Sequence, residues 1–190
     1  MITLVFFLEE FSAQSLLERL LPRLLPKEEF AFRFIPFEGK QDLEKQLVRK
    51  MRSWRNPNSR FIVLRDQDAN DCKAVKAHLV KLCRKAGHPE ALVRIACHEL
   101  ESWYLGDLRA VEKALPVGRL KHYQGSRKFR DPDHLANPSM ELERLTEGKY
   151  QKVAGSRAIA PHLDLGMHNR SRSFRAFVSG VSAHANGQKK

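Results

Sequence analysis

The apolar residues of the chain follow two patterns, which alternate along the sequence. In the first pattern, short continuous or alternating runs rich in Val, Ile, Leu and Phe predict strands buried in a parallel sheet. Runs 2–8 and 61–64 are continuous, whereas Phe30, Phe32 and Phe34 alternate with other residues. Four strands are predicted in this way, at 2–8, from Phe30 to near Gly39, at 60–64 and at 91–96.

In the second pattern the apolar residues recur every three or four positions, which is the spacing of amphipathic helices. In the first such stretch Ser12 occupies a helix N-cap position, and Pro22 is expected to kink or shorten the helix. Because strands alternate with helices, we expect βαβ units and a mostly parallel central sheet flanked by helices, which is an α/β fold. The predicted helices span 12–25, 42–54, 72–86, 140–146, 156–163 and 171–183.

The regular alternation ends near Pro116, where a basic and irregular stretch begins. We therefore expect an α/β core at 1–115 and, at 116–190, a basic loop and C-terminal helical extension that packs on the same domain. With 190 residues, of which 42% are apolar and 29% charged, the chain is long enough and apolar enough for a substantial core.

The charge of the chain indicates a polyanionic partner. The 34 basic and 22 acidic residues give a net charge of +12, which favours nucleic acid first and an acidic membrane surface second. No apolar run is long enough for a transmembrane helix, the start of the chain lacks the basic residues of a signal peptide, and no amphipathic terminal anchor stands out. We expect a soluble, cytoplasmic protein that does not bind membranes.

Acidic residues follow three of the predicted strands at the point where each strand ends. Parallel strands place their carboxyl ends at one edge of a sheet, where ligands commonly bind. Carboxylates gathered there repel one another unless a cation neutralises them, and Mg²⁺ prefers oxygen ligands. The alternative is that each pair begins the next helix, where acids favour the helix dipole. The acids are Glu9 and Glu10, Asp66 and Asp68, and Glu99 and Glu101.

Basic residues near and beyond these acids could contact phosphates. A lysine beside a metal site can stabilise charge that develops on a phosphoryl group, and Lys152 is the candidate, with Lys149 as the alternative. Together the other basic residues fit a surface that follows a phosphate backbone, although each one alone could be a solvated surface charge. These residues are Arg65, Lys121, Arg127, Lys128, Arg130, Lys149 and Arg157.

Six stretches form motifs that together cover nearly the whole chain. The most specific is Glu-Leu-Glu-Ser-Trp-Tyr-Leu-Gly-Asp, at 99–107. The stretches are 8–13, 39–43, 63–68, 94–107, 150–152 and 171–174. They resemble Toprim domains, which occur in topoisomerases, primases and nucleases of the overcoming-lysogenization-defect type. The finer resemblance is to the bacterial Toprim-like family numbered four-two-seven-six among domains of unknown function.

The resemblance implies a nuclease that cleaves nucleic acid with Mg²⁺ or Mn²⁺. Glu9 would be a metal ligand or general base, and Asp66 and Asp68 the principal metal ligands. Glu99 and Glu101 would lie where a second metal is held. Members of the family resemble components of bacterial phage-defence loci encoded beside AAA-type ATPases, which implies an ATPase partner.

Two positions depart from the nuclease pattern and keep other functions open. Nuclease-type members have glycine at the position of Glu10 and a further acid at the position of Ala13. The missing acid favours the alternative of a non-catalytic nucleic-acid-binding or assembly module with a Toprim fold. A phosphatase of the haloacid-dehalogenase type also opens with an apolar strand and two spaced aspartates, but Asn70 and the later position of this strand argue against it.

Overall fold

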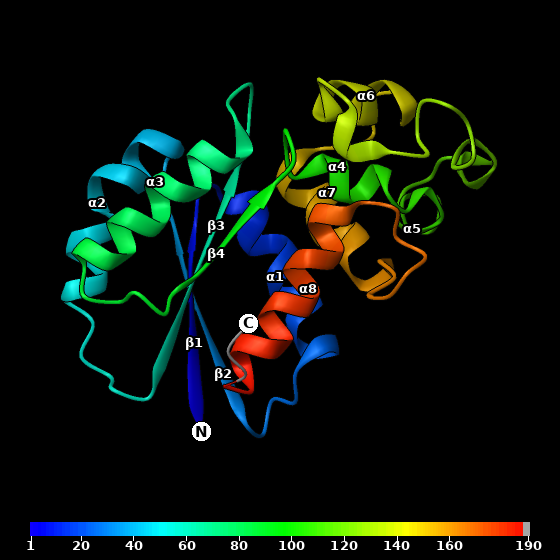
Figure 1. Cartoon of the computed structure of the whole chain (residues 1–190). Helices are drawn as coiled ribbons and strands as arrows, with labels where there is room; N and C mark the ends of the chain where they lie inside the picture. The colour runs from blue at the N-terminus through cyan, green and yellow to red at the C-terminus, as the bar shows by residue number, and fades with distance from the viewer. Residues whose placement is uncertain (188–190) are drawn as a thin grey trace.

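Four parallel strands form the central sheet in the order β2-β1-β3-β4 (Figure 1). The computed structural model describes residues 1–187, so the last three residues of the predicted extension lie outside it. Leu8 at the end of β1 pairs with Leu64, and Asp66 at the end of β3 pairs with Ala96. The carboxyl ends of three neighbouring strands therefore meet at one edge. The strands are β1 (Ile2–Leu8), β2 (Phe30–Pro36), β3 (Ser59–Asp66) and β4 (Leu92–Ala96).

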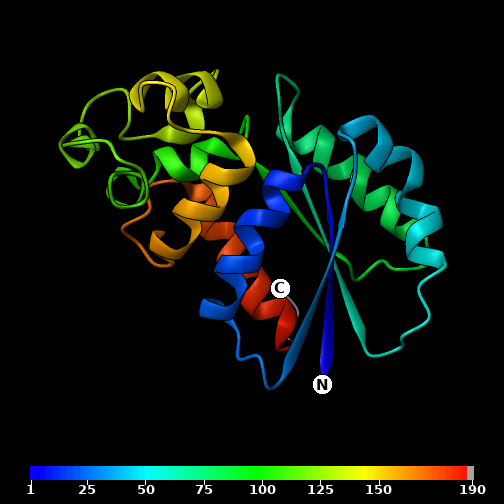
Figure 2. The ribbon, with the colours of Figure 1, turned by 180° about the vertical axis from the view of Figure 1, so that it is seen from behind.

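Helices cover both faces of the sheet, as the alternating pattern predicted (Figures 1 and 2). Successive side chains of a strand point to opposite faces, so Val5 and Phe7 of β1 pack in one apolar cluster and Leu4 and Phe6 in another. The smaller cluster contains side chains of α2 and α3, and the larger one contains side chains of the remaining helices. The longer helices are α1 (Phe11–Leu24), α2 (Lys40–Arg52), α3 (Cys72–Lys85) and α8 (Arg172–Ala185).

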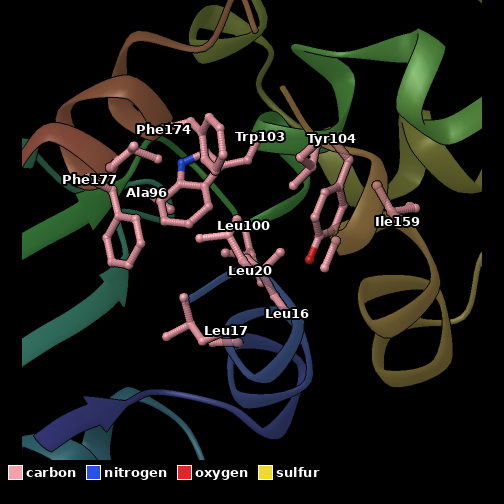
Figure 3. Packing of buried hydrophobic residues seen from close by; sticks show 14 of the residues in the cluster. Leu16, Leu17, Leu20, Ala96, Leu100, Trp103, Tyr104, Ile159, Phe174 and Phe177 are labelled. Atoms are coloured by element: carbon pink, nitrogen blue, oxygen red, sulfur yellow. The ribbon is translucent and has the colours of Figure 1, made fainter. Parts of the chain in front are cut away.

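The larger cluster joins residues from both ends of the chain around Trp103 (Figure 3). Trp103 is fully buried, and its ring centroid lies 5.3 Å from that of Phe174 and 4.9 Å from that of Phe177. Residues after 116 thus share one apolar core with the sheet. The shorter elements are α4 (Glu101–Leu105), α5 (Leu108–Ala114), α6 (Pro138–Leu145), α7 (Lys152–Ile159) and the 3₁₀ turns Leu120–Tyr123, Pro132–His134 and Ala160–His162.

Two helices differ in detail from their prediction. α1 continues through Pro22 and ends at Leu24, so proline does not shorten it, because it lies in the last turn of the helix. α7 begins at Lys152, four residues before the predicted start, and gives way to a 3₁₀ turn that contains Pro161. Within residues 1–187, no helix combines the length and the apolar character that crossing a membrane requires.

Candidate functional site

Glu9 and Asp66 lie side by side at the carboxyl ends of β1 and β3. The pairing of the two strands continues past Leu8, because the backbone N–H of Glu9 donates to the carbonyl oxygen of Leu64 at 3.3 Å. One carboxylate oxygen of Glu9 then accepts a hydrogen bond of 3.1 Å from the backbone N–H of Asp66. The sheet register therefore fixes these two acids next to each other.

Asp68 lies in a loop that is tied to the end of the neighbouring strand. Its backbone N–H donates to the carbonyl oxygen of His98 at 2.7 Å, and the side chain of Gln67 accepts from the backbone N–H of His98 at 3.3 Å. Asp68 and His98 both have a φ of 56°, in the left-handed region that non-glycine residues rarely adopt. The Asp68 carboxylate lies 2.8 Å from the ammonium nitrogen of Lys40, the first residue of α2.

Glu101 and Glu99 point to different partners. Glu101 is 2% exposed and its carboxylate accepts a hydrogen bond of 2.9 Å from the hydroxyl of Tyr150. Glu99 instead accepts a hydrogen bond of 2.7 Å from the backbone N–H of Ser139, in the first turn of α6. Glu101 thus faces the acids of the sheet edge, and the carboxylate of Glu99 is engaged by α6. We call Glu9, Glu10, Asp66, Asp68 and Glu101 the acid cluster.

Burial and mutual repulsion raise the pKa values of three acids in this cluster. The pKa of Asp66 lies well above its usual range, mainly because of burial and then because of the charges of Glu9, Glu101 and Glu10. Burial also raises the pKa of Glu9, with Asp68 adding to the effect, while the hydrogen bond from Asp66 opposes it. Burial raises the pKa of Glu101, against the opposing charge of Lys152. The cluster therefore favours protons or a cation.

Besides Lys40, two basic side chains neutralise part of this charge. Lys152 begins α7, and its ammonium nitrogen lies 3.5 Å from a carboxylate oxygen of Glu10. Burial acts to lower the pKa of Lys152, but the charges of Glu101, Glu10 and Asp66 outweigh it and the pKa is raised. The guanidinium of Arg65 bonds to Glu44, and its Nε lies 3.8 Å from Glu9.

The burial of Arg65 does not agree with its predicted contact to nucleic acid. Only 5% of this side chain is exposed, because it points between β3 and α2 toward the two glutamates.

Two more of the predicted phosphate contacts have partners within the protein. Lys128 forms an ion pair of 2.5 Å with Glu141, and the ammonium group of Lys149 donates to the carbonyl oxygen of Pro116.

The other predicted phosphate contacts are found at several cavities and exposed positions. Arg127 and Arg130, together with Lys128, line a depression of about 510 Å³. Lys121 lines a different cavity, and Arg157 is exposed on α7. Their role in binding a phosphate backbone stays a prediction.

The acid cluster fits a divalent cation by the chemistry of its donors. The adjoining cavity, lined by Glu9, Asp66 and Ala13, measures about 10 Å³, which is about the room that one water needs. Burial raises the pKa of the nearby Tyr104 hydroxyl, and the charges of Glu101 and Asp66 add to the effect.

The carboxylates of the acid cluster are not arranged around a single ion in this structure. Among the described residues, no three His, Cys, Asp or Glu side chains are grouped as a metal site. Lys40 holds Asp68 by an ion pair between two partly exposed side chains. The oxygen donors and the excess negative charge suit a divalent cation such as Mg²⁺. A cation bound by Asp68 together with Glu9 and Asp66 would require Asp68 to leave Lys40.

Sequence analysis did not single out Lys40, Tyr104 or Tyr150 as site residues. Lys40 and Tyr150 lie in two of the motifs that carry the resemblance, and each precedes or begins a helix near the acids. Their spacing to the acids along the chain carries no signal, because 28 residues separate Lys40 from Asp68 and 49 separate Glu101 from Tyr150.

Comparisons with known proteins agree with this architecture. The family model described as "Domain of unknown function (DUF4276)" matches residues 8–182. A solved structure, the C-terminal region of the Burkholderia pseudomallei OLD protein, has 15% sequence identity and a TM-score of 0.58, with 97% of each chain covered. That likeness confirms the predicted α/β Toprim-like fold. No curated protein matches the chain. From the extent of the family match, the chain belongs to the DUF4276 family.

Proposed function

We propose that the chain is a Toprim-like nuclease that cleaves phosphodiester bonds of nucleic acid with Mg²⁺ or Mn²⁺ at the acid cluster. The observation that carries the proposal is the contact between Glu9 and Asp66 at the ends of neighbouring strands, where burial and like charge raise both pKa values. Such an arrangement costs stability when the acids are ionised. It is explained if a divalent cation offsets the cost.

The residues of the cluster have separate roles in this proposal. Glu9, Asp66 and Asp68 would hold the cation, with Glu101 near a second one. Glu99, which lies outside the cluster, would join this second cation only by giving up its hydrogen bond from Ser139. A bound divalent cation polarises a phosphate oxygen and lowers the pKa of a coordinated water. Glu9, whose pKa is raised, would accept a proton from the attacking water.

Lys152 would stabilise the negative charge that develops on the phosphoryl oxygens. Its raised pKa keeps the ammonium group charged at neutral pH, and about half of its side chain is exposed to an incoming phosphate. Arg127, Arg130 and Arg157 would contact the backbone elsewhere, which makes binding sensitive to salt. An AAA-type ATPase partner, a role in bacterial phage defence and a cytoplasmic location complete the proposal, and the first two rest on the resemblance.

A second candidate is a non-catalytic module that binds nucleic acid or assembles with a partner. Two observations favour it. Asp68 is paired with Lys40 rather than directed at Glu9, and Ala13 lines the small cavity where nuclease-type members have an acid.

Calorimetry with Mg²⁺ and Mn²⁺ separates the two candidates. We expect the wild type to bind metal, and the double variant Asp66→Asn with Asp68→Asn to bind at least tenfold more weakly. Glu28→Gln with Glu29→Gln is the matched control, because it removes the same two charges from exposed positions. A wild type that binds nucleic acid but no metal, even with both present, would overturn the nuclease proposal and support the module.

A further inference from the structure

A second cavity lies away from the acid cluster. It measures about 690 Å³ and is lined by residues of α5, the end of α1 and the segment 162–168. α1 begins beside Glu10 and ends near Arg23, and a helix of 14 residues spans about 20 Å. None of the acid cluster lines this cavity. We call it the basic cavity.

Basic side chains enter the basic cavity from opposite walls. Arg109 and Lys113 are four residues apart on α5, so they lie on one face of the helix. Both are exposed, and neither has an ion pair or side-chain hydrogen bond within residues 1–187. Lys121 lines the cavity as well, 3.9 Å from Glu112, and His162 and His168 line the facing segment.

The two acids of the cavity wall are engaged by the backbone. The Asp107 carboxylate accepts from the N–H of Ala110 at 3.1 Å and from the N–H of Asp164 at 2.8 Å. The Asp164 carboxylate accepts from the N–H groups of Gly166 at 2.8 Å and His168 at 3.2 Å. Their oxygens thus hold the segment 162–168 in place rather than pairing with Arg109 or Lys113.

Arg23 holds the segment that follows α7 against the end of α1. Its guanidinium donates to the carbonyl oxygens of Ala160 at 2.7 Å and Leu163 at 2.8 Å. These contacts join the end of α1 to the 3₁₀ turn after α7. The walls are therefore preformed, and a ligand would not have to order them, which favours affinity.

We propose that the basic cavity binds a phosphate-bearing ligand of nucleotide size. Its volume lies within the range of about 300–1,000 Å³ that small-molecule sites occupy. Arg109, Lys113 and Lys121 supply the cationic donors that phosphate oxygens require, and Leu165 supplies an apolar wall. The ligand is a free nucleotide or the phosphorylated end of a nucleic-acid strand, which present the same chemistry.

The first test is calorimetry with ATP in the presence of EDTA, so that no metal can hold the nucleotide at the acid cluster. We expect the wild type to bind and the double variant Arg109→Glu with Lys113→Glu to bind at least tenfold more weakly. The matched control is Lys45→Glu with Arg49→Glu, the same charge change at the same spacing on the exposed face of α2. Circular dichroism and thermal unfolding confirm that each variant is folded.

The second test identifies the source of the phosphate, again in EDTA so that the acid cluster holds no metal. If a hexanucleotide with a 5′-phosphate binds more tightly than both ATP and its unphosphorylated form, the cavity is assigned to strand ends. If ATP binds more tightly, the cavity is assigned to free nucleotides. Glu28→Gln with Glu29→Gln, at exposed positions that do not line the cavity, is expected to leave both affinities within twofold. The proposal is overturned if the wild type binds neither ATP nor the phosphorylated hexanucleotide up to about 1 mM, or if this variant or the α2 control weakens binding as much as the α5 variant.

Discussion

The carboxylate of Glu9 and the backbone N–H of Asp66 are joined by a hydrogen bond of 3.1 Å across the ends of β1 and β3. This bond stabilises the ionised form of Glu9, yet the pKa of Glu9 is still raised because burial and the charge of Asp68 outweigh it. The acid cluster is therefore held together by the register of the sheet against its own repulsion.

The stability of the metal-free protein should fall as the pH rises from about 4, the ordinary carboxylate pKa. Glu9, Asp66 and Glu101 have raised pKa values in the folded state, so the folded state binds more protons than the unfolded state in this range. Stability then decreases with pH up to the folded pKa values. Lys152 contributes in the alkaline range, because its pKa is raised in the folded state. Its stabilising contribution is complete below the ordinary lysine pKa and is lost as the pH rises through the folded-state pKa.

Asp66→Asn should reduce this pH dependence. The amide keeps the shape of the carboxylate and removes one charge from the cluster, so we expect the melting temperature at pH 8 to rise by about 2–4 °C, the change that about 1 kcal/mol produces in a chain of this size. Thermal unfolding between pH 4 and pH 8 in EDTA measures it. Glu28→Gln, at an exposed position, should leave the pH dependence as in the wild type; an equal change in both variants would contradict the assignment to Asp66.

Lys40→Ala should strengthen metal binding by up to about fivefold. The ion pair of Lys40 with Asp68 joins partly exposed side chains, and such pairs are worth at most about 1 kcal/mol. Removing the ammonium group frees Asp68 for a cation, while the free energy of unfolding changes by no more than about 0.5 kcal/mol. Calorimetry with Mn²⁺ checks the affinity, with Lys45→Ala on the same helix as control. Weaker binding in Lys40→Ala would mean that Asp68 does not move to the metal.

The hydrophobic pattern was sufficient to predict the sheet and the edge where its acids lie. Continuous apolar runs define β1 and β3, and parallel pairing then requires Glu9 and Asp66 to lie together. The pattern could not predict that Glu99 would turn to α6, because Glu99 and Glu101 have the same side chain and only the packing of α6 against α4 separates them.

The basic residues were the least predictable part of the candidate site. The charge of a lysine or arginine is visible in the sequence, but its partner is not, since Arg65 bonds to Glu44 and Lys149 to Pro116. Exposure also depends on neighbours far along the chain. The cavity between α5 and the segment 162–168 could not be predicted from spacing for this reason.

Tyr150→Phe should destabilise the protein by about 1.5–3 kcal/mol. The hydroxyl of Tyr150 donates to the carboxylate of Glu101, and both side chains are buried. Without this donor a buried acceptor loses a partner, and hydrogen bonds to charged groups contribute in this range. Urea unfolding at pH 7 measures the change. Tyr123→Phe, which removes the same atom from an exposed ring, is the control and should have no effect.

Gly155→Ala should destabilise the protein by displacing Tyr150. A Cβ atom at Gly155 would overlap Cδ2 of Tyr150, so the ring or the helix must shift, and we expect the shift to weaken the hydrogen bond between Tyr150 and Glu101. Overpacking of this kind costs about 1–3 kcal/mol, partly offset by the better helix propensity of alanine, about 1 kcal/mol. Gly125→Ala, where a Cβ meets open space, is the control and should leave stability nearly unchanged.

A double-mutant cycle tests whether Gly155 acts through Tyr150. If the alanine displaces the ring from Glu101, Gly155→Ala and Tyr150→Phe both lower the free energy of unfolding by removing the same hydrogen bond. The double variant should then be less destabilised than the sum of the two single variants, by more than the 0.3–0.5 kcal/mol or so within which independent sites add. Additive losses in urea unfolding would show that Gly155 does not control the position of Tyr150, and that the clash is relieved elsewhere in α7.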